Sequence, residues 1–169
     1  MVRTGGPGRG CGTGGFSMLE IVVVMVIGAV LVAVALPNFN KLMTRHQLDT
    51  AARQLAADLR EARERAQTER TPYEVKFFKE ADRYVIRKYV QGQGFYLVHS
   101  VELPPRVDMF YAKFFGQVQD HVLWFNSFGE PSGAAANGAV GLKTRAGGEL
   151  RYVIISKTGR VRVSDQPPD

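Results

Sequence analysis

The feature that most constrains the fold of this chain is an uncharged run of 20 residues, Ile21–Asn40, close to its start. In an α-helix such a run is about 30 Å long, which matches the hydrocarbon core of a bilayer. Valine, isoleucine, leucine and alanine surround the whole helix and are not confined to one face, so a half-buried surface helix does not suit the run. The run therefore predicts a helix that inserts into a membrane or into a bundle of helices.

The residues alone allow two alternatives to a permanent anchor. A secretory signal peptide would end at a cleavage site with the pattern small residue, any residue, small residue. Ala33-Val34-Ala35 fits this pattern. The run is long for a signal peptide, however, and Glu20 interrupts its beginning. A lipoprotein would use Cys11, but no apolar stretch precedes that residue. We therefore expect the segment to remain in the protein as an anchor.

The residues before the run resemble a known processing signal. Gly14-Gly15-Phe16-Ser17-Met18-Leu19-Glu20, followed by the apolar run with a proline near its end, is similar to the type III signal and N-terminal helix of type IV pilins and type II secretion pseudopilins. The resemblance implies that a prepilin peptidase/N-methyltransferase cuts between Gly15 and Phe16 and that Phe16 is methylated. It also implies a cytoplasmic leader, one pass through the inner membrane, and a C-terminal head on the extracytoplasmic side.

Glu20 has a physical reason to be functional in such a protein. A carboxylate buried among packed helices needs a cation, and acidic residues beside a membrane span usually mark function. The free α-amino group of Phe16 in a neighbouring subunit would supply that cation, so Glu20 is expected to set the axial register between subunits. The expected partners are other major and minor pilins or pseudopilins, and membrane lipid before assembly. Pro37 lacks an N–H group and is expected to kink or loosen the helix.

Residues 41–70 predict a water-exposed continuation of the helix. Apolar side chains recur at spacings of three and four along one stripe, with charged and polar residues opposite: Leu48, Ala52, Leu55, Leu59, Ala62 and Ala66. A free coiled coil is the alternative, although the small alanines favour packing on the protein's own sheet. Thr71-Pro72 is expected to end the helix.

Residues 71–169 predict a head of short strands and turns. Runs of β-branched and aromatic residues are separated by glycine-rich and polar turns, and 15 aromatic residues are available for a core. The expected strands are Tyr73–Phe78, Arg83–Val90, Phe95–Val101, His121–Phe125, Ala139–Thr144, Leu150–Ser156 and Arg160–Val163. The interval of residues 79–120 matches no family pattern closely.

The predicted architecture is an α+β, pilin-like fold, in which a long N-terminal helix packs on an antiparallel β-sheet head. Its expected parts are a cleaved leader at residues 1–15, a hydrophobic helix at 16–40, the amphipathic helix at 41–70 and the head at 71–169. The 45% apolar content thus overstates the apolar character of the head, since much of it lies in the hydrophobic helix.

Signals for catalysis are missing from the sequence. His46, His99 and His121 are far apart and lack metal-ligand spacing, and the single Cys11 lies in the expected leader. No nucleophile elbow, zinc-protease helix or phosphate-binding loop motif occurs. We therefore expect a protein that is not an enzyme and needs no cofactor or metal.

The last third of the chain sharpens the resemblance. Trp124-Phe125-Asn126-Ser127-Phe128-Gly129-Glu130 and, later, Ile154-Ile155-Ser156-Lys157-Thr158-Gly159-Arg160-Val161-Arg162 are similar to the C-terminal pattern of the GspH/FimT minor pseudopilins. Members of that family have a β-rich head and lie at or near a filament tip. Some of its minor pilins are thought to bind DNA through a Gly-Arg-x-Arg motif.

Most of the excess positive charge of the chain, +6 in total, lies in residues 143–162. Strand alternation places Arg160 and Arg162 on one face, where both could contact phosphates. Lys157, Arg145 and Arg151 could extend the site, and such binding should be salt-sensitive and independent of sequence. The alternative is a solvated strand edge whose arginines discourage aggregation. The sequence thus predicts a minor pseudopilin, a filament subunit, with a DNA-binding minor pilin acting in DNA uptake as the second hypothesis.

Overall fold

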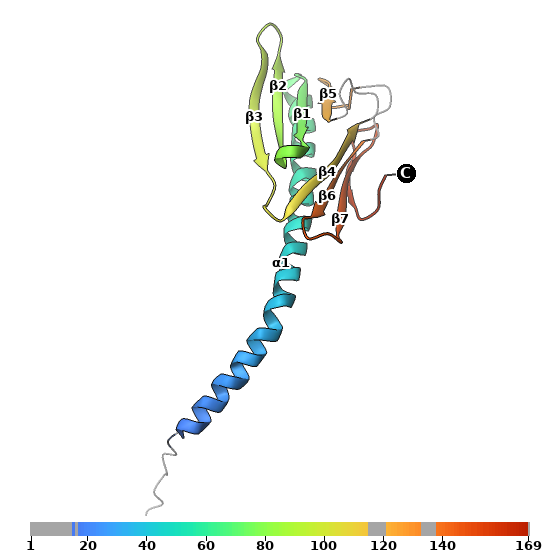
Figure 1. Cartoon of the computed structure of the whole chain (residues 1–169). Coiled ribbons are helices and arrows are strands. Elements are labelled where there is room, and N and C mark those ends of the chain that lie inside the picture. Colours follow the sequence, from blue (N-terminus) through green and yellow to red (C-terminus); the bar gives the residue numbers. More distant parts are fainter. Residues whose placement is uncertain (1–14, 16, 115–120, 133–137, 169) are drawn as a thin grey trace, which may run out of the picture. The chain divides into compact units, whose positions relative to one another are not determined.

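The computed structural model describes residue 15 and residues 17–114, 121–132 and 138–168, without the side chains of residues 34–38. The chain divides into two compact units, residues 1–40 and 41–169. A single helix, α1 (Met18–Glu69), begins in the first unit and ends in the second (Figure 1).

In the first unit, α1 starts from the Ser17 carbonyl, which accepts the N–H groups of Glu20 and Ile21 at 3.0 and 3.2 Å. The described apolar side chains from Met18 to Val32 are mostly exposed. Among the described residues, no helix combines the length and the apolar character that a membrane crossing requires. Pro37 lies within α1, and its side chain is outside the described residues, as is the valine of the alternative cleavage site, Val34.

The part of α1 in the second unit carries the predicted apolar stripe. All six residues of the stripe are buried, with exposures of 1% or less: Leu48, Ala52, Leu55, Leu59, Ala62 and Ala66. They share one core with side chains of both sheets, so the stripe packs on the protein's own head and the coiled-coil alternative is wrong for this segment. The stripe and the α+β class are thus confirmed.

Helix α1 ends at Glu69, two residues before Thr71 of the predicted Thr71-Pro72 stop. Arg70 adopts a left-handed conformation with φ of 52°, and the N–H of Thr71 bonds to the carbonyl of Ala66 at 3.3 Å. In helices that end in this way, the residue after the last helical turn is usually glycine. An arginine in this conformation carries backbone strain, since its Cβ approaches the following carbonyl oxygen.

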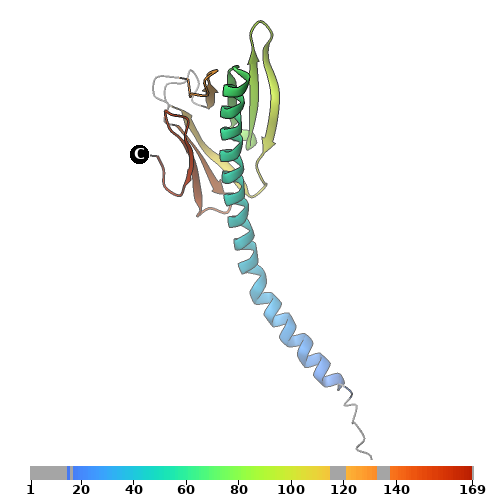
Figure 2. The same cartoon turned by 180° about the vertical axis from the view of Figure 1, so that it is seen from behind.

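The head contains two four-stranded antiparallel sheets, whereas the sequence predicted one. The first has the order β3-β2-β1-β5 and the second the order β4-β6-β7-β8 (Figures 1 and 2). The strands of the first sheet are β1 (Tyr73–Phe78), β2 (Arg83–Val90), β3 (Gly94–Glu102) and β5 (Val122–Phe125). Those of the second are β4 (Val107–Phe114), β6 (Gly138–Thr144), β7 (Leu150–Ile155) and β8 (Val161–Ser164). A short 3-10 helix, Lys79–Ala81, connects β1 and β2.

Strand β4 is the element that the sequence prediction missed. Its pairing with β6 shifts by one residue between Met109 and Tyr111, so a bulge at Phe110 changes which side chains face the core. Val107 and Met109 are buried before the bulge, and Ala112 and Phe114 after it. A bulge breaks the period of two on which strand prediction rests, so the alternation is not visible over the whole strand.

A carboxylate lies inside the core between α1 and the first sheet. Asp58 of α1 is 5% exposed and accepts a hydrogen bond from the hydroxyl of Tyr84, which is 1% exposed, at 2.5 Å. The amide of Gln54 donates to the other oxygen of Asp58 at 2.8 Å. Buried charged groups require such partners, so this cluster fixes how the helix sits on β2.

Candidate functional site

The predicted N-terminal site lies only partly within the described residues. Gly15 is exposed, with no atom within 4 Å of the position that a Cβ would occupy, whereas Phe16 and the first 14 residues lie outside the described part. Glu20 is in the first turn of α1, where the positive end of the helix dipole favours a carboxylate. Its side chain is exposed and forms no ion pair with a described residue.

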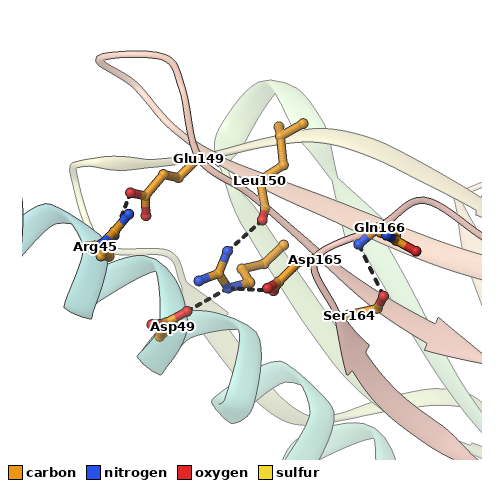
Figure 3. A network of polar contacts seen from close by, with 8 residues as sticks. Arg45, Asp49, Glu149, Leu150, Ser164, Asp165 and Gln166 are labelled. Carbon is orange, nitrogen blue, oxygen red and sulfur yellow. Dashed lines mark hydrogen bonds and ion pairs between the residues drawn. The ribbon is translucent and has the colours of Figure 1, made fainter.

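The structure separates Arg145 and Arg151 from the other predicted basic residues. Arg145 donates to Asp82 at 2.5 Å, and the other oxygen of Asp82 accepts the N–H of Met109 at 2.8 Å. Arg151 donates to Asp49 of α1 at 2.6 Å and lies 3.2 Å from Asp165 (Figure 3). Both arginines therefore have carboxylate partners that compensate their charge, and both connect parts of the fold.

A second ion pair fixes the same end of the second sheet on the helix. Arg45 of α1 donates to Glu149, which precedes β7, at 2.5 Å (Figure 3). The guanidinium of Arg151 also donates to the carbonyl of Leu150 at 2.9 Å. This network of polar contacts holds the β6–β7 hairpin against α1, which is a structural role.

Two glycine turns lie together at the other end of the second sheet. In the first turn, Asn126 accepts the N–H of Gly129 at 2.8 Å, and in the second, Ser156 accepts the N–H of Gly159 at 2.8 Å. Both glycines have positive φ, 74° and 75°, and both are buried. A Cβ on Gly159 would lie 3.2 Å from the carbonyl oxygen of Gly129, so the two turns touch.

One face of α1 supports both turns. Arg60 donates to the carbonyl of Val161 at 3.0 Å, Arg63 to that of Gly129 at 3.2 Å, and Gln67 to that of Phe128 at 2.9 Å. These three residues are spaced by three and four along the helix and so lie on one side. The sequence predicted that the polar side of this helix faces water. Nothing in the helix pattern shows that carbonyl groups of distant turns accept hydrogen bonds from it.

The glycine of the Gly-Arg-x-Arg motif therefore has a structural explanation. A Cβ on Gly159 would lie 2.8 Å from the Nε atom of Arg63, and the positive φ disfavours any other residue. The glycine permits the close approach to the helix, and the chain leaves it directly into Arg160 and β8. The position of both arginines thus depends on this turn.

Arg160 and Arg162 are exposed on either side of Val161, which is 6% exposed and faces the core. Arg162 in β8 and Arg160 directly before the strand are therefore both on the outer side, as the sequence predicted. Lys157 is exposed in the second turn. Among the described residues, no carboxylate pairs with any of these three side chains, so they form the basic turn: Lys157, Arg160 and Arg162.

The described part of the head holds no group of three or more potential metal ligands. His99 lines a groove of about 260 Å³ between α1 and the first sheet, but the nearby Glu61 and Arg65 pair with each other at 2.6 Å. Nothing in this groove pairs a nucleophile with a base. The basic turn is thus the best candidate for a binding site in the described residues, because its exposed positive charges can bind anions.

Comparisons with solved structures identify the fold. EpsH, the minor pseudopilin from the type 2 secretion system of Vibrio cholerae, matches in two structures with TM-scores of 0.59 and 0.60 and sequence identities of 13% and 14%. The alignments cover 70% and 73% of this chain and 97% and 98% of EpsH. The type IV minor pilin FimU of Pseudomonas aeruginosa matches with a TM-score of 0.54 at 19% identity, covering 71% of this chain and 90% of FimU.

No protein-family model and no curated protein matches the sequence. The likenesses to EpsH and FimU lie at low identity and establish the fold. The chain has a pilin-like fold, in which the helix packs on antiparallel sheets as in these minor pilin-type proteins.

Proposed function

We propose that this chain is a minor pseudopilin, a structural subunit of a type II secretion or type IV pilus-like filament. One observation supports the proposal most: the helix that packs on a pilin-like fold's sheets also includes Glu20 and the uncharged run, and Gly15 lies just before it in the sequence. The head alone would fit many roles, and the N-terminal pattern alone could be a signal. Together they fit a subunit that is assembled through its N-terminal helix.

In this proposal, a prepilin peptidase/N-methyltransferase removes residues 1–15 and methylates Phe16. The hydrophobic helix, residues 16–40, anchors the protein in the inner membrane with its head on the extracytoplasmic side, and then moves into the filament core. There Glu20 pairs with the α-amino group of a neighbouring subunit. The head resembles those of minor subunits, so we place the chain near the filament tip, in contact with other pilins or pseudopilins.

Cleavage after Gly15 is the test of this proposal. The full chain is co-expressed with a prepilin peptidase, and the intact mass of the product is measured. We expect a protein that begins at Phe16 and carries one N-terminal methyl group. Gly15→Val should remain uncut, and Gly14→Ala, one residue away, should be cut normally. A product that still begins at Met1, or one cut after Ala35, contradicts the proposal.

A DNA-binding minor pilin acting in DNA uptake is the second candidate, which we infer from the basic turn. Lys157, Arg160 and Arg162 are exposed and without a carboxylate partner in the described head, so their charge is available to phosphates. Arg145 and Arg151 have partners and are left out of the proposed site. The two arginines that remain can each approach a phosphate with two donors.

Removal of Arg160 and Arg162 should weaken the binding of duplex DNA whatever its base sequence. Residues 41–169 comprise the head and the part of α1 that packs on it, and they contain the described core. This fragment, called the isolated head below, serves for DNA titrations. We expect Arg160→Ala/Arg162→Ala to lower duplex affinity and to reduce the slope of log affinity against log salt by about 2. Lys79→Ala/Arg83→Ala removes the same charge near β2 and should change the affinity little. Equal effects of the two double variants would assign the binding to net charge and not to the basic turn.

A further inference from the structure

An aromatic ring is exposed next to the basic turn. Phe128 is 64% exposed in the turn after β5. Its N–H donates to the side chain of Asn126 at 2.9 Å and its carbonyl accepts from Gln67 at 2.9 Å, so its backbone is fixed on both sides. The turn follows β5, which lies beside the C-terminal end of α1 (Figures 1 and 2).

A cation covers one face of this ring. The guanidinium carbon of Arg70 lies 5.8 Å from the ring centroid of Phe128. Arg70 is the residue that ends α1 in the left-handed conformation, where glycine would avoid the strain. Strain that is kept at an exposed residue points to a role for its side chain. Even with Arg70 over it, Phe128 remains largely exposed to solvent.

The ring and the basic turn belong to one surface. Phe128 precedes Gly129, Arg160 follows Gly159, and the two glycines are in close approach. The same face of α1 holds both turns, since Arg63 and Gln67 donate to the first and Arg60 donates to Val161 directly after the second. Arg70 thus lies over the exposed ring, and the exposed cations of the basic turn, Lys157, Arg160 and Arg162, lie next to the turn that carries it.

We propose that this surface binds single-stranded DNA, with an unpaired base stacked on the exposed ring of Phe128. This inference rests on the DNA-binding function proposed above and names its ligand. In a duplex, neighbouring base pairs cover both faces of each base, so a protein ring finds no partner there. A single strand offers one π-face per nucleotide as well as its phosphates, and an aromatic ring beside cations is the usual platform for it. Arg160 and Arg162 contact the phosphates that flank the stacked base.

The test compares two nucleic acids on the isolated head. Residues 41–169 are titrated by fluorescence anisotropy with an oligo-dT of about 15 nucleotides, in the range of one single-strand site, and with a duplex of the same length. We expect Phe128→Ala to weaken oligo-dT binding about 10-fold, since stacking of one base contributes roughly that much. Duplex affinity and the salt dependence should stay unchanged, because no charge is removed. Phe128→Tyr should retain the affinity for oligo-dT.

Tyr96→Ala is the matched control, since Tyr96 is a similarly exposed aromatic residue, 49%, on the edge strand β3. Arg70→Gly, which the left-handed backbone accepts without strain, should weaken oligo-dT binding without unfolding the head. If Phe128→Ala behaves like Tyr96→Ala while Arg160→Ala/Arg162→Ala still loses duplex affinity, the single-strand inference is wrong and the DNA-binding function stands. If the parent head binds neither nucleic acid, both fail together.

Discussion

Tyr84→Phe is expected to lower the free energy of unfolding of the head by about 2–4 kcal/mol, although it removes one oxygen atom only. The hydroxyl of Tyr84 is the donor to Asp58, which is 5% exposed in the core. Without it, a buried carboxylate keeps Gln54 as its one described donor. The loss measured by urea unfolding therefore reflects a desolvated charge more than a missing contact.

Tyr73→Phe is the matched control for this substitution. Tyr73 is as deeply buried, at 1% exposure, and also donates to a carboxylate, that of Glu69 at 3.0 Å. Glu69 is partly solvated and also pairs with Lys88, so its charge remains satisfied when the hydroxyl is lost. We expect Tyr73→Phe to cost less than about 1 kcal/mol. Equal losses for the two variants would contradict the role given to Asp58.

Alkaline pH should reveal the same interaction. Burial, and then the hydrogen bond to Asp58, raise the pKa of Tyr84 far above its usual value. Above a pH of about 10 the unfolded chain releases this proton and the folded head keeps it, so stability falls with pH by up to about 1.4 kcal/mol per unit. Tyr84→Phe should show a shallower fall. The remaining slope then includes Tyr73, whose pKa is also raised by burial.

The sequence predicted the helix stripe and seven of the strands because their patterns are local. The spacing of Leu48, Leu55 and Leu59 is set by the helix period, and the sequence of β1 alternates apolar and charged residues from Tyr73 to Phe77. The pairing of strands into two sheets depends on long-range contacts, in particular on the crossing from β3 to β4 through Leu103-Pro104-Pro105. No local pattern encodes such a crossing, and the bulge in β4 removes even the local signal.

The candidate site was predictable only in part, for a similar reason. The alternation around Val161 placed Arg160 and Arg162 correctly. The positive charge of Arg145 and Arg151 gave no sign of their partners, since Asp82 and Asp49 are 63 and 102 residues away in the chain. Arg70 and Phe128 come from distant segments as well, so their contact became visible only in the folded head.

Gly129→Ala is expected to destabilise the head by about 2–4 kcal/mol, more than a positive φ alone explains. Left-handed backbone costs a non-glycine residue about 1–2 kcal/mol. In addition, a Cβ at Gly129 would lie 2.5 Å from the Cγ atom of Gln67, so this side chain must move and release the carbonyl of Phe128. An unpaired carbonyl and a displaced turn add about 1–2 kcal/mol.

Gly147→Ala separates the two contributions. Gly147 has almost the same φ, 76° against 74°, but no atom lies within 4 Å of its Cβ position. We expect it to cost only the backbone term, so the difference between the two variants measures the contact of the turn with α1. Gln67→Ala in the Gly129→Ala background should then recover part of the loss by removing the clash. If both glycine variants unfold at the same urea concentration, α1 does not hold the turn. Phe128 and the basic turn would then lack the rigid support that stacking on a single strand requires.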